Sequence, residues 1–232
     1  VPILFYRSML LAGDVAPIDA LAAELAQQGI DAVPVFVSSL RDPAALDAVS
    51  QAVEALKPAA LVTATAFASM AEPGEATPFD RFGLPVFQVL TATTRRSAWE
   101  DGLRGLAPAD LAMHVVLPEL DGRILAGAIS FKDSGGDDSA AAVQSNRPEQ
   151  DRVRQAAARI AAFLRLQATP PQERTIAILI PDYPAATGRT GYAVGLDVPA
   201  SVIAMLHDLK EAGYRVEEIP ETPRDLMRLL AR

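Results

Sequence analysis

The chain has 232 residues, half of them apolar, a formal net charge of −8 and no cysteine. This length and apolar content suit one large or two small α/β domains with a substantial core, whereas the acidic balance argues against a nucleic-acid surface, which needs clustered Lys and Arg. The absence of cysteine excludes disulfides and thiolate metal sites, so a bound metal would need oxygen ligands or imidazole from His114 or His207.

Strands and helices alternate along the first part of the chain. The predicted strands are 2–6, 32–37, 60–64 and 85–90, because each is a short apolar run bounded by polar or turn residues. Helical spacing of apolar residues predicts helices after residue 15, closed by Gly29, and after Asp42-Pro43, which supplies an N-cap and a first-turn proline. Residues 7–14 are predicted as a polar loop. We therefore expect an α/β fold with a mostly parallel sheet in three layers, built from βα repeats.

The pattern loosens after Gly105. Residues 113–117 are strand-like, 119–123 read as a turn, and 124–131 are predicted to return as an antiparallel strand. Residues 132–147 are polar and lack apolar periodicity, which indicates a surface loop and a candidate lid. Apolar residues at helical spacing then predict a helix over 152–167.

Thr169-Pro170-Pro171 ends that helix and marks a domain boundary. We expect an α/β domain over 1–170 and the start of a second, similar α/β unit over 171–232, with a strand at 175–180, a polar loop at 181–196 and a helix at 199–212. An aspartate precedes the first helix of both units, Asp14 in one and Asp197 in the other. Two such units could face each other across a cleft, although strand, loop, helix and glycine cap are also common to all α/β folds.

Two carboxylates follow the apolar run Val115-Val116-Leu117-Pro118, namely Glu119 and Asp121. At a strand's period of two residues they would share a face, and in a cavity one would be protonated while the other stayed ionised, as acid–base chemistry requires. His114 could join them in a nitrogen-and-oxygen site suited to cobalt. Spacing alone favours a turn here, because Asp-Gly is a common turn dipeptide. A lone histidine such as His114 is more often a hydrogen-bonded core residue than a metal ligand.

Residues suited to anionic and planar ligands follow two of the strands. Tyr6 and Arg7 end the first strand, and Arg95, Arg96 and Trp99 follow the strand at 85–90. A guanidinium can clamp a carboxylate and an aromatic ring can stack on a macrocycle. Sequence alone favours the alternative, in which Trp99 packs in the core and the arginines are solvated.

Several familiar chemistries lack their motifs. Gly188, Gly191 and Gly195 precede a helix, but their spacing fits neither the nucleotide P-loop nor the dinucleotide fingerprint. There is no Gly-x-Ser-x-Gly elbow and no cysteine nucleophile, so covalent hydrolase chemistry is not expected.

Several strings, in their order along the chain, resemble the large subunit of cobaltochelatase, which is related to the H subunit of magnesium chelatase. Leu-Pro-Glu-Leu-Asp-Gly at 117–122 is the most distinctive. The others are Phe5-Tyr6-Arg7-Ser8, Pro34-Val35-Phe36-Val37-Ser38-Ser39-Leu40, Ala66-Phe67, Pro85-Val86-Phe87-Gln88, Gly105-Leu106-Ala107-Pro108, Ile129-Ser130-Phe131-Lys132 and Gly195-Leu196-Asp197-Val198-Pro199-Ala200-Ser201.

The resemblance implies an internal segment of a longer cytoplasmic subunit that holds a tetrapyrrole, while two partner ATPase subunits hydrolyse ATP and drive metal insertion. For the cobalt branch, cobalt(II) would enter the corrin hydrogenobyrinic acid a,c-diamide during aerobic cobalamin biosynthesis; for the magnesium branch, magnesium would enter protoporphyrin. The isolated segment is expected to be inactive. Neither a membrane nor a nucleic acid is an expected partner.

The same resemblance assigns roles to individual residues. Insertion requires a base for the ring protons and an oxygen ligand for the metal. Glu119 is expected to be the essential carboxylate with Asp121 as its partner, and His114 with Glu119 to hold cobalt. The residues expected to contact the macrocycle are Tyr6, Arg7, Asp14, Gln88, Arg95 and Trp99. The main rival is a two-lobed α/β module that binds a small ligand without catalysis.

Overall fold

The computed structural model describes residues 1–70, 76–103, 105–133, 144–180, 191 and 193–231. The chain divides into two compact units, Val1–Leu164 and Arg165–Arg232. The predicted boundary after residue 170 lies close to this division, and the assignment of two separate domains stays a prediction. Within the described residues, no helix is both long enough and apolar enough to span a bilayer.

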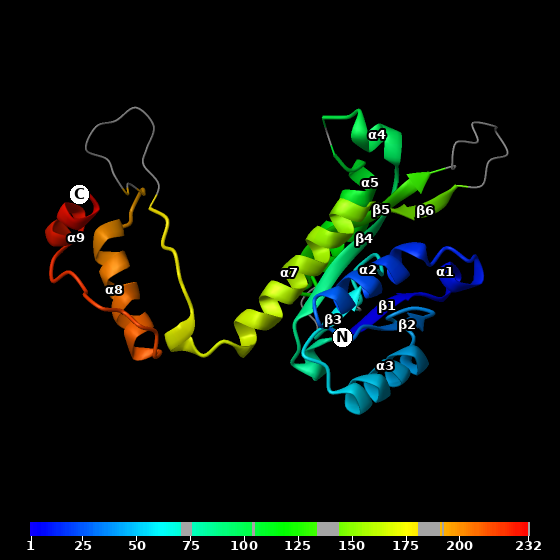
Figure 1. Ribbon diagram of the computed structural model, residues 1–232, viewed down its shortest axis with the longest axis horizontal. Coiled ribbons are helices and arrows are strands. Elements are labelled where there is room, and N and C mark those ends of the chain that lie inside the picture. Colours follow the sequence, from blue (N-terminus) through cyan, green and yellow to red (C-terminus); the bar gives the residue numbers. More distant parts are fainter. Residues whose placement is uncertain (71–75, 104, 134–143, 181–190, 192, 232) are drawn as a thin grey trace. The chain divides into compact units, whose positions relative to one another are not determined.

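The first unit is built on a six-stranded sheet of order β2-β1-β3-β4-β5-β6 (Figure 1). Strands β1 to β5 pair in parallel and β6 is antiparallel to β5. The predicted α/β fold with a mostly parallel sheet is confirmed. The strands are β1 Pro2–Tyr6, β2 Val33–Val37, β3 Leu61–Thr63, β4 Val86–Arg95, β5 Ile124–Asp133 and β6 Ser145–Pro148.

Helices cover both faces of this sheet. Those of the first unit are α1 Arg7–Leu11, α2 Ala16–Gln27, α3 Pro43–Leu56, η1 Asp80–Phe82, α4 Arg96–Glu100, α5 Pro108–Leu111, the π-helical turn η2 Ala112–Val116, α6 Leu117–Glu119 and α7 Gln150–Ala168, which continues into the second unit. Helices α2, α3 and α7 follow the predicted pattern: Asp42 accepts a hydrogen bond from the Ala44 N–H as the N-cap of α3, and Gly29 takes a left-handed φ of +76° just after α2.

Alternate residues of the buried strands pack on opposite faces. Ile3 of β1 joins apolar side chains of α2 and α7 in one core, whereas its neighbour Leu4 joins Val49 of α3 in another. The sheet therefore lies between two helical layers, which is the three-layer arrangement expected from the sequence (Figure 1).

Three local predictions were wrong. Residues 7–11 form helix α1 instead of part of a loop. Residues 113–117 are helical, because Pro108 starts a helical segment that continues through α6 while β4 and β5 pair directly and leave no place in the sheet for another strand. The strand predicted at 124–131 exists as β5 but runs parallel to β4. The antiparallel return comes from β6, which begins inside the loop predicted at 132–147. Residues 134–143 of that predicted loop lie outside the described residues.

In the second unit, the helix predicted at 199–212 is confirmed as α8 Val198–Glu211, preceded by the 3₁₀ turn η3 Pro171–Glu173 and followed by α9 Pro223–Leu230. The strand predicted at 175–180 is not formed, because this extended segment has no ladder partner among the described residues. Most of the polar loop predicted at 181–196, with Gly188, lies outside the described residues.

Candidate functional site

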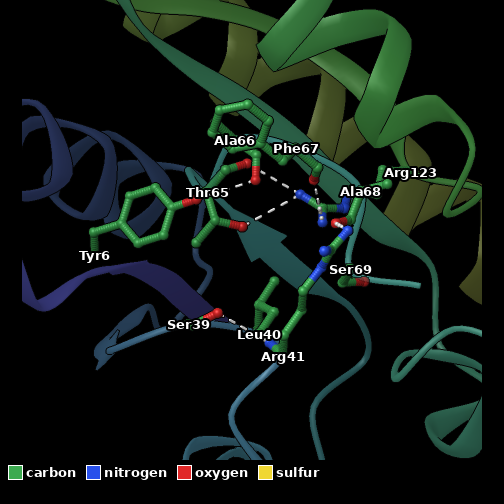
Figure 2. A pocket seen from close by; sticks show the side chains of 10 residues that line it. All are labelled: Tyr6, Ser39, Leu40, Arg41, Thr65, Ala66, Phe67, Ala68, Ser69 and Arg123. Carbon is green, nitrogen blue, oxygen red and sulfur yellow. Dashed lines mark hydrogen bonds between the residues drawn. The ribbon is translucent and has the colours of Figure 1, made fainter. Parts of the chain in front are cut away.

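The candidate site lies where the strand order of the parallel sheet reverses. The chain leaves β1 towards β2 on one side and returns to β3 on the other, and ligands of open α/β sheets bind outside the carboxyl ends of the strands at such a point. A cavity of about 250 Å³ lies here, between the end of β1 and the loops that follow β2 and β3 (Figure 2). It is lined by Tyr6, Ser39, Leu40, Arg41, Thr65, Ala66, Phe67, Ala68, Ser69 and Arg123.

The buried guanidinium of Arg123 organises this cavity. Its Nε and Nη2 donate to Asp121 Oδ2 at 3.0 and 2.6 Å, its Nη1 donates to Gln88 Oε1 at 2.9 Å and to the Thr65 carbonyl at 3.0 Å, and its Nη2 also donates to the Phe67 carbonyl at 3.0 Å. These contacts engage all five N–H groups of the guanidinium. Arg123 is therefore a brace between β4, the start of β5 and the loop after β3, with no donor left for a ligand.

Asp121 joins Arg123 to the loop after β3. Besides Arg123, its carboxylate accepts from the Ser69 N–H at 2.8 Å, the Ser69 hydroxyl at 2.8 Å and the Met70 N–H at 3.2 Å. Neither side chain of the Asp121–Arg123 pair is exposed. Burial lowers the pKa of Arg123, and the charge of Asp121 opposes this effect. Each charge of the pair has its partner and a full set of hydrogen bonds, which offset the cost of burying it.

Every backbone carbonyl of the loop from Thr65 to Ala68 accepts a hydrogen bond from a side chain. Gln88 Nε2 donates to the Thr65 carbonyl at 3.0 Å, the Tyr6 hydroxyl to the Ala66 carbonyl at 3.1 Å and the Arg41 Nη2 to the Ala68 carbonyl at 3.2 Å, beside the Arg123 contact to Phe67. Burial raises the pKa of Tyr6, so its hydroxyl keeps the proton it donates. The loop is thus held in one conformation by four side chains from other segments, of which Figure 2 shows Tyr6, Arg41 and Arg123.

Phe67 adopts a conformation that a bulky residue rarely takes. Its φ is +63°, in the left-handed region, and its side chain is 48% exposed at the cavity. Such a backbone costs free energy and persists only where the surroundings impose it, which is common at binding sites. Here its captured carbonyl and its N–H, which donates to the Met113 carbonyl at 2.8 Å, impose it.

The structure brings together three of the residues predicted from the sequence, Tyr6, Gln88 and Asp121. Arg7 is exposed at the start of α1, next to Tyr6 in the chain. Asp14 does not line this cavity. Its carboxylate accepts hydrogen bonds from the Asn146 N–H at 2.7 Å, from Asn146 Nδ2 at 2.6 Å and from Lys132 Nζ at 3.3 Å. These contacts join the start of α2 to β5 and β6.

Arg95 and Trp99 lie around the end of β4. The Trp99 ring stacks on the buried Phe131 ring with centroids 4.3 Å apart, and the Arg152 guanidinium lies 5.8 Å from its centre. The half-buried indole therefore packs against other side chains of the protein. Arg95 is exposed, while Arg96 pairs with Glu149 and Glu100. Contacts of Arg95 and Trp99 with a macrocycle stay predictions.

Glu119 and Asp121 do not share a face, and that inference from strand spacing was wrong. The segment is helical up to Glu119, which is exposed, whereas Asp121 is buried in the brace. No partner of the Glu119 carboxylate occurs among the described residues. The essential role of Glu119 remains a prediction that the geometry leaves open.

Whereas Glu119 is exposed, His114 is buried on the π-helical turn. Its Nε2 lies 3.9 Å from Asp110 Oδ1, and its Nδ1 has no partner among the described residues. Burial lowers the pKa of His114 although Asp110 acts against it. In the described parts of the chain, no three His, Asp or Glu side chains gather into a metal site, so cobalt binding by His114 and Glu119 stays a prediction.

The sequence analysis missed Arg123 and Arg41. A signal for Arg123 existed, since Asp121-Gly122-Arg123 places opposite charges two residues apart directly before a buried strand. Arg41 follows the β2 strand just as Arg7 follows β1 and could have been found by the same reasoning about strand ends.

Comparisons with known proteins agree along the whole chain. The family model for CobN/Magnesium Chelatase matches residues 1–232. The aerobic cobaltochelatase subunit CobN of a Sinorhizobium species is 38% identical over 99% of this chain and 18% of its own length, and that of Pseudomonas aeruginosa is 37% identical over 99% and 19%. The rice chloroplastic magnesium-chelatase subunit ChlH is 27% identical over 97% and 16%.

A solved structure also matches. The catalytic subunit of cobaltochelatase from Mycobacterium tuberculosis superposes with a TM-score of 0.79 at 28% identity, covering 99% of this chain and 20% of that one. The chain thus spans about a fifth of the length of the relatives it matches. The resemblance drawn from its motifs is confirmed, and the chain belongs to the CobN/magnesium chelatase family.

Proposed function

We propose that the chain is part of the tetrapyrrole-holding subunit of a cobalt chelatase, which inserts cobalt(II) into hydrogenobyrinic acid a,c-diamide during aerobic cobalamin biosynthesis. The observation that carries this proposal is the 37–38% identity to two CobN subunits over 99% of the chain. In this proposal the subunit works in the cytoplasm with two partner subunits that hydrolyse ATP, and this chain binds no ATP itself.

Metal insertion needs a group that accepts the pyrrole protons while the metal loses water. Glu119 suits this role better than Asp121, because its carboxylate is exposed and has no partner in the described part of the chain. Asp121 is committed to Arg123 and to the Ser69 and Met70 amides. We assign Glu119 as the base and Asp121 as a positioning residue that keeps the neighbouring cavity in shape.

The test is Glu119→Gln in the complete subunit, with its partners, ATP and cobalt(II). Loss of a general base is expected to slow insertion by about 100-fold or more, while the affinity for the corrin stays close to that of the native subunit. The matched control is Glu54→Gln, which neutralises an exposed glutamate on α3 and should leave insertion unchanged. An unchanged insertion rate in Glu119→Gln would refute the assignment of the base.

Magnesium insertion into protoporphyrin is the second candidate, favoured by the 27% identity to the rice ChlH subunit. The two functions are separated by incubating the complete subunit with each tetrapyrrole in turn and measuring the dissociation constants by fluorescence quenching. Tighter binding of protoporphyrin than of the corrin would favour magnesium insertion over cobalt insertion.

A further inference from the structure

The cavity at the ends of β1, β2 and β3 carries one uncompensated positive charge. None of its ten lining residues is acidic, although the chain as a whole has a net charge of −8. The charge of Arg123 is cancelled by Asp121 at 2.6 Å. The guanidinium of Arg41 donates one hydrogen bond, to the Ala68 carbonyl at 3.2 Å, and forms no ion pair with the described residues. A monovalent anion would therefore find a matching charge here.

Backbone amides add donors beside this charge. The N–H groups of Ala66 and Ala68, which line the cavity, have no acceptor among the described residues, whereas that of Phe67 is already used by the Met113 carbonyl. Free amides that flank a left-handed residue are a common anion-binding arrangement of the backbone. The carbonyls of the same loop are all captured by side chains, so no carbonyl of residues 65–68 is left free to repel an anion.

The shape and chemistry of the cavity select a carboxylate on a short aliphatic arm. Its volume of about 250 Å³ is below the roughly 300–1,000 Å³ of pockets that enclose a whole drug-sized ligand. Leu40, Phe67 and the alanine methyl groups give apolar contact for an arm, and the planar fork of Arg41 matches a carboxylate. A phosphate dianion would lack a second charge partner.

We propose that this cavity binds a carboxylate carried on a short aliphatic arm, with Arg41 as its charged ligand and Arg123 as the brace that fixes the loop. Two sources share this chemistry: a carboxylate side arm of the tetrapyrrole, which rests on the proposed function, and a free small carboxylate, which does not.

Propionate is the probe, observed by saturation-transfer NMR with the complete subunit. We expect saturable binding to the native subunit. Arg41→Gln removes a charge-assisted hydrogen bond and should weaken binding by about tenfold or more. Arg81→Gln, which removes an exposed arginine that does not line the cavity, should leave it unchanged. Circular dichroism and melting temperature verify that both variants fold as the native subunit does.

Competition then identifies the source. If hydrogenobyrinic acid a,c-diamide displaces propionate while its methyl ester does not, the tetrapyrrole arm occupies the cavity. If the corrin binds without displacing propionate, the ligand is a free carboxylate and the proposed function still stands. Propionate binding that is undetectable in the native subunit, equal in Arg41→Gln, or competed equally by methyl propionate would overturn the proposal. Failure of the corrin to bind at all would instead refute the proposed function.

Discussion

Replacing Arg123 by methionine tests whether the Asp121–Arg123 pair is the brace of the site. Methionine fills a similar volume in the core but removes every hydrogen bond that the guanidinium makes to Gln88, Thr65, Phe67 and Asp121. It also leaves the Asp121 carboxylate buried without its counter-charge.

The expected loss of stability follows from this burial. Removing one partner of a fully buried ion pair costs about 3–5 kcal/mol, which is a large part of the roughly 5–15 kcal/mol that stabilises a typical protein. Adding Asp121→Asn should recover at least about 1 kcal/mol, because the neutral amide removes the unpaired charge and its oxygen can still accept from the Ser69 N–H. The two substitutions are therefore expected to be less than additive.

The measurement is urea unfolding followed by the fluorescence of Trp99, the only tryptophan in the sequence, which packs on Phe131 in the first unit. Arg154→Met, at an exposed position on α7, is the matched control and should change the unfolding free energy by less than about 0.5 kcal/mol. If Arg123→Met cost no more than this control, or if the double variant were as unstable as the sum of the single ones, the brace would be refuted.

Three further outcomes are expected from the same unfolding assay. Ile160→Ala, at a fully buried position of α7, should cost about 2–5 kcal/mol, against little for Leu166→Ala, which is half exposed. Asp14→Ala leaves the Asn146 N–H without its acceptor and should cost about 1–3 kcal/mol; a neutral effect would mean that this contact does not hold β6. Burial lowers the pKa of His114 in the folded chain, so near the ordinary value of 6.5 only the unfolded chain takes up a proton. The free energy of unfolding should therefore fall as the pH decreases through that value. His114→Asn should flatten this dependence, and an equally steep dependence in the variant would exclude His114 as its cause.

The strands and helices could be predicted where polar, capping or proline residues mark the ends of an apolar pattern. Strand β1 was predicted at its observed bounds because a short apolar run ends at polar residues, and α3 because Asp42 and Pro43 mark its start. The run at 113–117 is too short for its periodicity to separate a helix from a strand. The direction of β5 depends on its pairing with β4, which no local pattern records.

The site could be predicted only in part for a similar reason. Tyr6 was found because polar residues at the end of a buried strand face the ligand edge of a parallel sheet, and Gln88 was named only through the family resemblance. Arg123 was missed because its burial depends on acceptors from Thr65, Phe67 and Asp121, which come together only in the folded chain. An arginine is normally exposed, and the opposite charges two residues apart in Asp121-Gly122-Arg123 indicate an ion pair but not its burial.

The Leu-Pro-Glu-Leu-Asp-Gly segment is helical up to Glu119 and then turns, and this changes what its two carboxylates can do. Helix α6 ends at Glu119 and the chain turns through residues 120–122, so Asp121 leaves the chain in a different direction from Glu119, whereas on a strand the two side chains would share one face. The observed burial agrees, with Asp121 inside and Glu119 exposed. The two carboxylates therefore do not form one acid–base pair: Asp121 holds the loop that shapes the cavity, and Glu119 is the carboxylate that the proposed function assigns as the base. Substitution of Asp121 should consequently lower stability and insertion together, whereas Glu119→Gln should lower insertion alone.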